Sequence, residues 1–255
     1  MNVTRRDLLL DGLKTICAVE FMRVCIATQA YAASVAPNIE QWRIALEAIA
    51  RDFRSDSLPL AQWHAAIEEL NRRVPMEDLL KLVEFENVQP RLLALGEGEH
   101  FEKLFLPSVS NVGRPFSSSI FGVSAGAQVP PHAHNNQVTA HMLVRGQLHT
   151  RTFERLHDVE GAITVKPKRD ELLGVGTTVT MSSERENVHW FTAQKEPAFS
   201  FQISAGTPRS LSSHHVNQEE PGGRVYLDLR GKPESDGTIV APVIDPMVSH
   251  RLYGA

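Results

Sequence analysis

Apolar side chains recur at steps of three and four residues in the part of the chain that follows residue 38. In the stretch 39–53 this spacing places one apolar stripe on a helix, made by Ile39, Trp42, Leu46, Ile49 and Phe53. The stretch 60–74 repeats the pattern, and a shorter amphipathic stretch covers 76–85 after Pro75. The pattern therefore predicts a helical region over roughly the first hundred residues.

From about residue 103 the helical spacing gives way to short β-prone runs separated by Gly, Pro and polar residues. These predicted strands are Ser117–Val123, Thr139–Val144, Leu148–Phe153, Thr177–Met181, Val188–Thr192 and Phe199–Ile203. The stretch 206–223 is typical of a polar loop, and Arg224–Leu229 is a further predicted strand. Many short strands favour a sandwich or barrel over a parallel sheet, and the sequence shows no internal repeat that would indicate two barrels.

Composition and charge narrow the function classes. The chain has 255 residues, a formal net charge of -4 and no long basic run, so it lacks the cationic stripe that nucleic acid binding requires. No sequence feature indicates binding to a membrane surface. Two cysteines, Cys17 and Cys25, are too few for a disulfide framework and favour buried thiols in a reducing, cytoplasmic compartment.

The first thirty residues allow two interpretations. The segment Thr4–Arg6 resembles a twin-arginine export signal, and Ala30–Ala32 resembles a cleavage site. The charges of Lys14, Glu20 and Arg23 interrupt the apolar region that an export signal needs, whereas an amphipathic helix accommodates them. We expect a retained helix in a cytoplasmic protein, with export as the alternative.

The segment Pro130–His134 carries the strongest chemical signal. In an extended strand, side chains two residues apart point to the same face, so the imidazoles of His132 and His134 project together. Converging neutral imidazoles are natural ligands of a divalent transition metal. His189, which lies between apolar neighbours on a predicted strand, is the best candidate for a third ligand.

Glycines near these histidines add a resemblance to a known family. Gly126 lies six residues before His132, and Gly146 lies twelve residues after His134. This arrangement resembles the first motif of the cupin superfamily, and a later glycine followed by His189 resembles the second motif in a looser form. The resemblance implies an α+β protein, in which a cupin-type antiparallel β-barrel (a double-stranded β-helix, or jelly roll) follows an N-terminal helical region. We therefore divide the chain into a helical region, 1–102, and a cupin β-barrel, 103–255.

Within the cupins, the local motifs are most similar to those of the three-histidine thiol dioxygenases, namely the cysteine dioxygenases, the cysteamine dioxygenases and the plant cysteine oxidases. The similar segments are Pro115–Phe121, Val129–His134, Gly146–His149, Asn187–His189 and Glu196–Ser200. Thr139 stands where many cupins have a metal-binding glutamate, which agrees with a site made of His132, His134 and His189 alone. The resemblance implies Fe(II) as the cofactor, with Zn, Ni or Mn as alternatives, and oxidation of a small thiol by dioxygen to a sulfinate.

The residues that would read the substrate depart from these enzymes. Thr139 and Ser204 stand where cysteine dioxygenase has the cysteine and tyrosine of its crosslink, and no arginine aligns with the one that binds the substrate carboxylate. His141 shares a strand face with Thr139, and Gln202 replaces a histidine or aspartate of the relatives. We predict catalytic roles for His141 and Gln202, although a hydrogen-bonded core histidine is an equal alternative for His141.

Other polar residues have plainer interpretations. Arg145 and Arg151 would each suit a carboxylate clamp, but both are expected on the surface. Tyr226 and Asp228 are minor candidates for a pocket, and the pair His214–His215 is expected to be solvated, with a lid role as the alternative. The histidines without a partner pattern are interpreted as surface residues: His64, His100, His157 and His250.

Two alternative functions stay open. One is a different three-histidine dioxygenase that cleaves a carbon–carbon bond in a diketone or enol. The other is a non-catalytic metal-binding sensing module whose helical region contacts partners. A homo-oligomer is compatible with the sequence. The sequence does not specify which thiol is the substrate.

Overall fold

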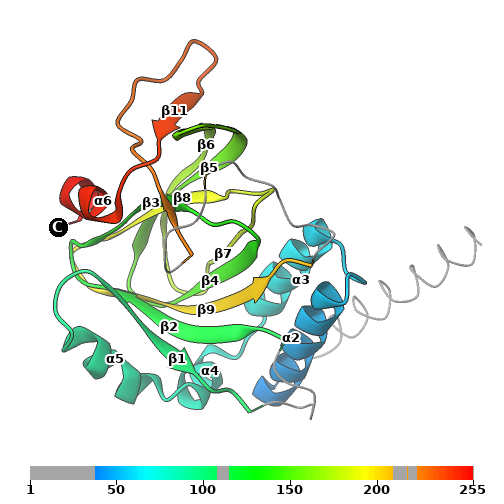
Figure 1. Ribbon diagram of the computed structural model, residues 1–255. Helices are drawn as coiled ribbons and strands as arrows, with labels where there is room; N and C mark the ends of the chain where they lie inside the picture. Colours follow the sequence, from blue (N-terminus) through cyan, green and yellow to red (C-terminus); the bar gives the residue numbers. More distant parts are fainter. Residues whose placement is uncertain (1–37, 108–114, 209–216, 218–222, 255) are drawn as a thin grey trace, which may run out of the picture.

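The computed structural model describes residues 38–107, 115–208, 217 and 223–254, and their arrangement is drawn in Figure 1. The predictions for the N-terminal segment, for both cysteines and for the pair His214–His215 lie outside the described residues. Among the residues that are described, no helix is long and apolar enough to cross a membrane.

Four helices precede the strands in the described part of the chain: α2 (Ile39–Arg54), α3 (Leu60–Arg72), α4 (Met76–Leu82) and α5 (Phe85–Leu93). α2 begins at a capping box, in which the Asn38 side chain accepts a hydrogen bond from the backbone N–H of Gln41 at 2.9 Å. A proline stands immediately before α3 and before α4, where its fixed φ suits the entry to a helix. The apolar stripes of 39–53 and 60–74 contribute to one buried core, so this part of the helical prediction is confirmed.

The strands form two curled antiparallel sheets (Figure 1). The first sheet has the order β1 (Glu99–Leu104), β2 (Ser117–Val123), β9 (Ala198–Gly206), β4 (Gln137–Arg145), β7 (Thr178–Met181). The second has the order β10 (Val225–Tyr226), β3 (Gln128–Ala133), β8 (Val188–Ala193), β5 (Leu148–Val159), β6 (Ala162–Leu173), β11 (Ile239–Pro242). From β2 to β9 the chain passes back and forth between the two sheets, with β5 and β6 together in the second. Within each sheet an early strand pairs with a late one, as β2 does with β9 and β3 with β8, which is the topology of a jelly roll. The chain therefore has the cupin-type fold that the sequence predicts.

The helices pack on the outer face of the first sheet. The outward residues of β4 and β9 share their apolar core: Val138, Ala140, Met142, Val144, Phe199, Phe201, Ile203 and Ala205. Trp42 of α2 meets the Phe201 ring edge-on with centroids 5.8 Å apart, and Phe85 of α5 meets Phe199 at 5.5 Å. The helical region is thus attached to the barrel by a common core. β1 begins at Glu99, and the division of the chain at residue 102 stays a prediction.

The inner faces of the sheets differ from one end of the barrel to the other. One end is filled by an apolar cluster: Phe121, Val123, Ala127, Val129, Leu143, Leu148, Leu173, Val179, Met181, Phe191, Ala193 and Ala198. Toward the other end the same inner faces carry buried or half-buried polar side chains, among them Ser119, Thr139, His189 and Gln202. The apolar end closes the barrel, and the polar end is where a ligand site can form.

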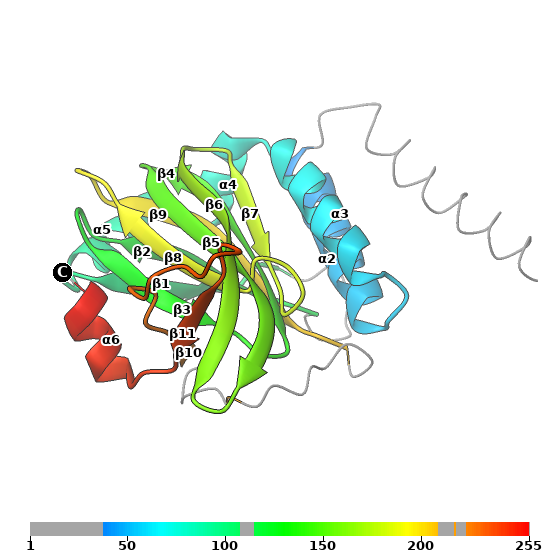
Figure 2. The same cartoon turned by 90° about the horizontal axis from the view of Figure 1, so that it is seen from above.

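The C-terminal part of the chain covers the outer face of the second sheet. An apolar cluster there joins strand residues with the segment after β10: Ala133, Phe153, Ile163, Val165, Val188, Val225, Leu227, Leu229, Ile239 and Ala241. Helix α6 (Pro246–Tyr253) packs beside it, where the Tyr253 ring meets Trp190 with centroids 5.2 Å apart. Figure 2 shows α6 on the side of the barrel opposite α2 and α3.

The elements that the sequence analysis did not predict include β1, β6, β11 and α6. β6 was missed because its second half is mostly exposed. The charged residues in Lys166–Glu171 hide the alternation that marks a half-buried strand. The predicted strand Arg224–Leu229 was too long, since only Val225–Tyr226 pairs as β10.

Candidate metal centre

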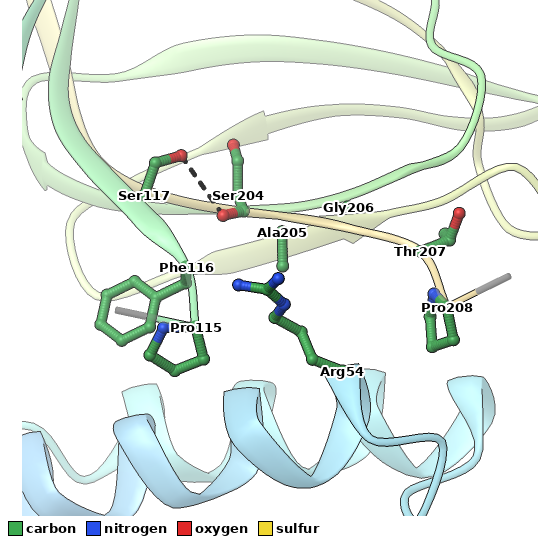
Figure 3. A pocket seen from close by; sticks show the side chains of 9 residues that line it. All are labelled: Arg54, Pro115, Phe116, Ser117, Ser204, Ala205, Gly206, Thr207 and Pro208. Atoms are coloured by element: carbon green, nitrogen blue, oxygen red, sulfur yellow. Dashed lines mark hydrogen bonds between the residues drawn. The ribbon is translucent and has the colours of Figure 1, made fainter. Parts of the chain in front are cut away.

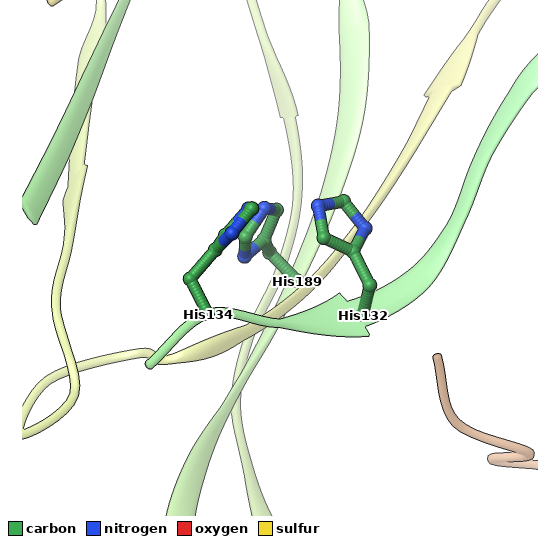
Figure 4. Close-up of side chains that lie close together, drawn as sticks. All are labelled: His132, His134 and His189. Carbon is green, nitrogen blue, oxygen red and sulfur yellow. The ribbon is translucent and has the colours of Figure 1, made fainter. Parts of the chain in front are cut away.

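The strands that carry the predicted ligands are neighbours. His132 lies near the end of β3 with His134 just beyond it, and His189 lies near the start of β8, in register with His132. The ring centroids are 4.1 Å apart for His132 and His189, 4.9 Å for His132 and His134, and 5.5 Å for the third pair. One nitrogen of each ring lies within 4.8 Å of those of the other two (Figure 4). The three histidines thus form one cluster that could hold a metal ion.

A backbone carbonyl orients each ring. His132 Nδ1 donates to the carbonyl two residues before it at 2.8 Å, and His189 Nδ1 does the same at 3.1 Å. His134 Nδ1 donates to the carbonyl of Gly223. Because a carbonyl only accepts, the proton of each neutral ring resides on Nδ1 and the free lone pair is on Nε2. Ligating histidines in metal sites typically carry such a partner on their other nitrogen.

Burial keeps the three rings neutral. His132 and His189 are 2 % and 3 % exposed, and removal from water holds the pKa of each well below the ordinary value of 6.5. Burial also lowers the pKa of His134 to about 4, and the nearby guanidinium of Arg224 adds to this shift. Near pH 7 the rings therefore keep the Nε2 lone pair that a metal ion needs.

The local sequence explains the position of His132. β3 is in register with β8 at Val129 and again at His132, with an irregularity between these two positions. Pro130 and Pro131 occupy the irregular stretch. Because proline has no N–H to give to the strand ladder, it is found mainly at sheet edges and at such irregularities.

The backbone geometry of a tight turn requires the motif glycine that follows the histidine pair, Gly146. Gly146 lies in the turn between β4 and β5 with φ of +75°, and a Cβ atom there would lie 2.4 Å from the Pro197 carbonyl oxygen. Only glycine fits this turn, which brings β4 close to the loop before β9.

The two predicted catalytic residues, His141 and Gln202, lie opposite each other in the register of β4 and β9. His141 is buried, its Nδ1 lies 3.0 Å from Ser200 Oγ, and its ring meets Phe191 at 5.4 Å, which in turn meets the His189 ring at 5.3 Å. Burial lowers the pKa of His141 to about 3. A ring that stays neutral at pH 7 is better suited to orienting neighbours than to donating a proton, and its catalytic role stays a prediction.

Gln202 belongs to a neutral polar wall on the same inner face. It is half-buried, and its Oε1 accepts a hydrogen bond from Ser119 Oγ at 2.9 Å. Thr139 and Ser204 are opposite each other in the strand register, and Thr139 Oγ1 accepts from the Gln137 amide at 2.9 Å. The wall offers hydrogen bonds but no charge.

A half-buried arginine beside the histidines, Arg224, was missed by the sequence reasoning. Tyr226 of β10 lies opposite His132 of β3, so Arg224 falls beside His134 on the same inner face. The Arg224 guanidinium makes two hydrogen bonds to the Glu99 carboxylate of β1, and one of its nitrogens lies 3.3 Å from Tyr226 Oη. The alternation of Arg224 and Tyr226 on a predicted strand was a usable signal, but the partner of that strand was not known.

The other minor candidates lie elsewhere. Arg145 follows a register shift at the end of β4 and bonds to side chains of α5. Arg151 lies over the Trp190 ring at 4.2 Å, on the outer face of the second sheet. Asp228 is engaged in an ion pair with a neighbouring arginine. Neither Arg145 nor Arg151 is placed to clamp a substrate at the three histidines.

The interpretation of His64 as a surface residue was wrong. His64 is 2 % exposed on α3, and its Nε2 lies 3.1 Å from Ser182 Oγ. Burial, followed by the charge of Arg185, lowers its pKa to about 4. On the same helix face Glu68 accepts from Thr180 Oγ1 at 2.5 Å, so α3 packs a polar face against β7 that an apolar stripe does not reveal. The other histidines of this group are exposed or partly exposed: His100, His157 and His250.

A cavity of about 530 Å³ lies beside the C-terminal end of α2. Figure 3 shows Arg54 reaching from α2 toward β2 and β9, where the Ser117 hydroxyl donates to the Ser204 carbonyl at 3.3 Å. None of the three clustered histidines lines this cavity, so it is distinct from the candidate metal centre.

The donor set fits a divalent transition metal. Three neutral imidazoles with free Nε2 lone pairs are ligands that suit iron, zinc and nickel. A set of three protein ligands also leaves coordination positions for other molecules. The residues are therefore compatible with a divalent metal ion.

No protein-family model and no curated protein matches the chain. Similar solved structures include the Schizosaccharomyces pombe Cnp3 cupin domain (14 % identity, covering 44 % of this chain and 66 % of that chain, TM-score 0.31). A recombinant oxalate oxidase in complex with glycolate (18 %, 43 % and 52 %, TM-score 0.32) and KdgF from Halomonas sp. (11 %, 45 % and 84 %, TM-score 0.31) are also similar. The aligned part spans 20 % of procruciferin, an 11S globulin from Brassica napus. At these TM-scores the similarities carry no argument about function, and the fold rests on the strand order.

Proposed function

We propose that this protein is a metal-dependent cupin dioxygenase that oxidises a small thiol to a sulfinate. The observation that carries the proposal is the cluster of three neutral histidines with their Nε2 lone pairs free and no carboxylate in the group. Fe(II) bound there would supply adjacent positions for a thiolate and for dioxygen. The reaction balances as R–SH + O2 → R–SO2H. Two S–O bonds form, the O–O bond breaks, and sulfur loses the four electrons that dioxygen gains.

The chain's own residues would bind and orient the substrate. Arg224, next to His134, offers guanidinium N–H groups that suit an anionic substituent. Gln202 and Ser119 on the opposite sheet offer uncharged hydrogen bonds. Because Gln202 is neutral, we expect no strict requirement for a protonated amine on the thiol.

The proposal is tested with protein reconstituted with Fe(II) under reducing conditions. The substrates are cysteine, cysteamine, 3-mercaptopropionate, mercaptosuccinate, a peptide with N-terminal cysteine, and a diketone. We expect oxygen consumption with at least one thiol and a sulfinate that contains two ¹⁸O atoms when the gas is ¹⁸O2. Turnover of the diketone alone would favour the carbon–carbon cleaving alternative. No turnover at full iron occupancy would favour the sensing module.

A matched pair of variants tests the polar wall. Gln202→Leu is expected to raise KM about five- to tenfold, because one substrate hydrogen bond is lost. Gln128→Leu is the control, since Gln128 Oε1 accepts from the Trp190 indole at 2.8 Å on the outer face, and its KM should stay unchanged. Equal effects of both variants would remove Gln202 from the substrate site.

A further inference from the structure

We propose that Arg155 is a positioning residue that holds the two histidine-bearing turns of the metal centre together. The proposal rests on the proposed metal site but not on the substrate. Arg155 lies on β5, one of the strands adjacent to β8, and its side chain is only 1 % exposed. Asp158 balances its charge, with Nε to Oδ1 at 2.7 Å and Nη2 to Oδ2 at 2.5 Å.

The remaining guanidinium nitrogen, Nη1, joins two separate turns. It donates to Asn135 Oδ1 at 2.8 Å and to Asn187 Oδ1 at 3.2 Å. Asn135 directly follows His134, and Asn187 stands two residues before His189. One nitrogen of one side chain thus contacts both of the segments that carry predicted ligands.

Asn187 passes this connection to the ligands themselves. The Asn187 side-chain Nδ2 donates to the backbone carbonyl of His134 at 2.6 Å, and the Asn187 backbone carbonyl accepts from His189 Nδ1 at 3.1 Å. A shift of Asn187 would therefore move the backbone at His134 and turn the ring of His189. Partners of this kind commonly change metal affinity by about 10- to 100-fold when they are removed.

The backbone of β5 is shaped for this role. The register between β5 and β6 is irregular between Arg155 and His157, and bulges next to functional sites often re-aim a side chain. β5 pairs with β8 up to Phe153 opposite Val188, so Arg155 lies just beyond the paired stretch, beside the turn that holds Asn187. The planar fork of arginine can bond Asp158 and two amides at once, whereas the ammonium of lysine is a single point charge.

The test measures metal binding and needs no thiol. Arg155→Lys is titrated with Co²⁺ against a competing chelator, and the Co²⁺ absorption spectrum reports the ligand geometry. We expect affinity to fall about 10- to 100-fold, with a changed spectrum. Arg43→Lys is the control, because Arg43 has a 10 % exposed side chain paired with Glu40 three residues away on α2. Its affinity should stay within about twofold of the unaltered protein.

A second pair of variants covers the case in which Arg155→Lys does not fold. Asn135→Ala removes the acceptor and is expected to weaken Co²⁺ binding, whereas Asn135→Asp keeps an oxygen for Arg155 and should restore it. Unaltered affinity and spectrum in Arg155→Lys, or in Asn135→Ala where the lysine variant does not fold, would overturn the proposal even if thermal stability fell. Normal Co²⁺ behaviour of the unaltered protein without thiol oxidation would contradict the proposed function and leave the positioning role standing. A protein that binds no metal would contradict both.

Discussion

β4 and β9 carry different chemistry on their two faces. On the face toward the helices these strands contribute apolar side chains to the core that they share with the helices. There the Trp42 ring packs against Phe201, and the Phe85 ring packs against Phe199. On the face toward the barrel interior the same two strands carry polar residues: Thr139, His141, Ser200, Gln202 and Ser204. Adjacent positions of one strand therefore serve stability on one side and candidate chemistry on the other.

The two faces differ in their contribution to the stability of the fold. A buried polar group loses its water and destabilises the fold unless it is hydrogen-bonded. On the inner face these groups bond to one another, as Ser119 does to Gln202 and Ser200 to His141. Apolar side chains would be simpler to bury there. A polar inner wall beside three converging histidines is what a ligand site requires.

The largest effect is expected from breaking the inner face at the histidines. His132→Ala, His134→Ala and His189→Ala should each lose stoichiometric binding of divalent metal at micromolar concentrations, because a three-ligand site has no spare ligand. The barrel should remain folded. His157→Ala, an exposed histidine on β5, is the control and should bind normally. Isothermal titration calorimetry and metal content analysis measure the stoichiometry of binding. Full retention of metal by any of the three variants would remove that residue from the ligand set.

A smaller effect is expected from breaking the outer face. Phe201 is 0 % exposed, and Phe201→Ala should lower the free energy of unfolding by about 3–5 kcal/mol, since a cavity is left in the core. Metal affinity of the folded protein should stay the same. Gln202→Ala, one position along the strand, should cost less than about 1.5 kcal/mol. Urea unfolding measures both, and equal losses would mean that the two faces do not differ in the way described.

The smallest effect concerns the polar contact between α3 and β7. Burial lowers the pKa of His64 from 6.5 to about 4, so between these pH values the unfolded chain binds a proton that the folded chain does not. Its contribution to stability is complete above pH 6.5 and is lost as the pH falls toward 4, by up to about 3 kcal/mol. Arg185 opposes the charged ring and Glu186 favours it.

His64→Gln keeps a donor for Ser182 but does not titrate. The free energy of unfolding of this variant should therefore depend less steeply on pH between 6.5 and 4 than that of the unaltered protein. The difference between the two curves isolates His64 from the other buried histidines, which titrate in both proteins. Parallel curves would show that His64 is not buried as a neutral ring.

Much of the fold could be predicted because its signals are local. Helical spacing identified α2 and α3, and short β-prone runs identified most strands of the barrel. The His132 and His134 pair depended only on a two-residue step, and His189 on its position in a predicted strand. β6 was missed because its run of exposed charged residues removes the alternation of apolar and polar positions that identifies a strand.

The sequence by itself determined the type of α2, α3 and most strands of the barrel, the jelly-roll class through the motif glycines and histidines, and the three residues that now form a cluster. Only the tertiary structure decided which distant residues join them. Arg224 and Glu99 are 125 positions apart, and Arg155 meets Asn187 across 32. Such pairs depend on strand register and on how the two sheets close. Register and closure come from many weak contacts summed over the whole core, so no short stretch of sequence contains them.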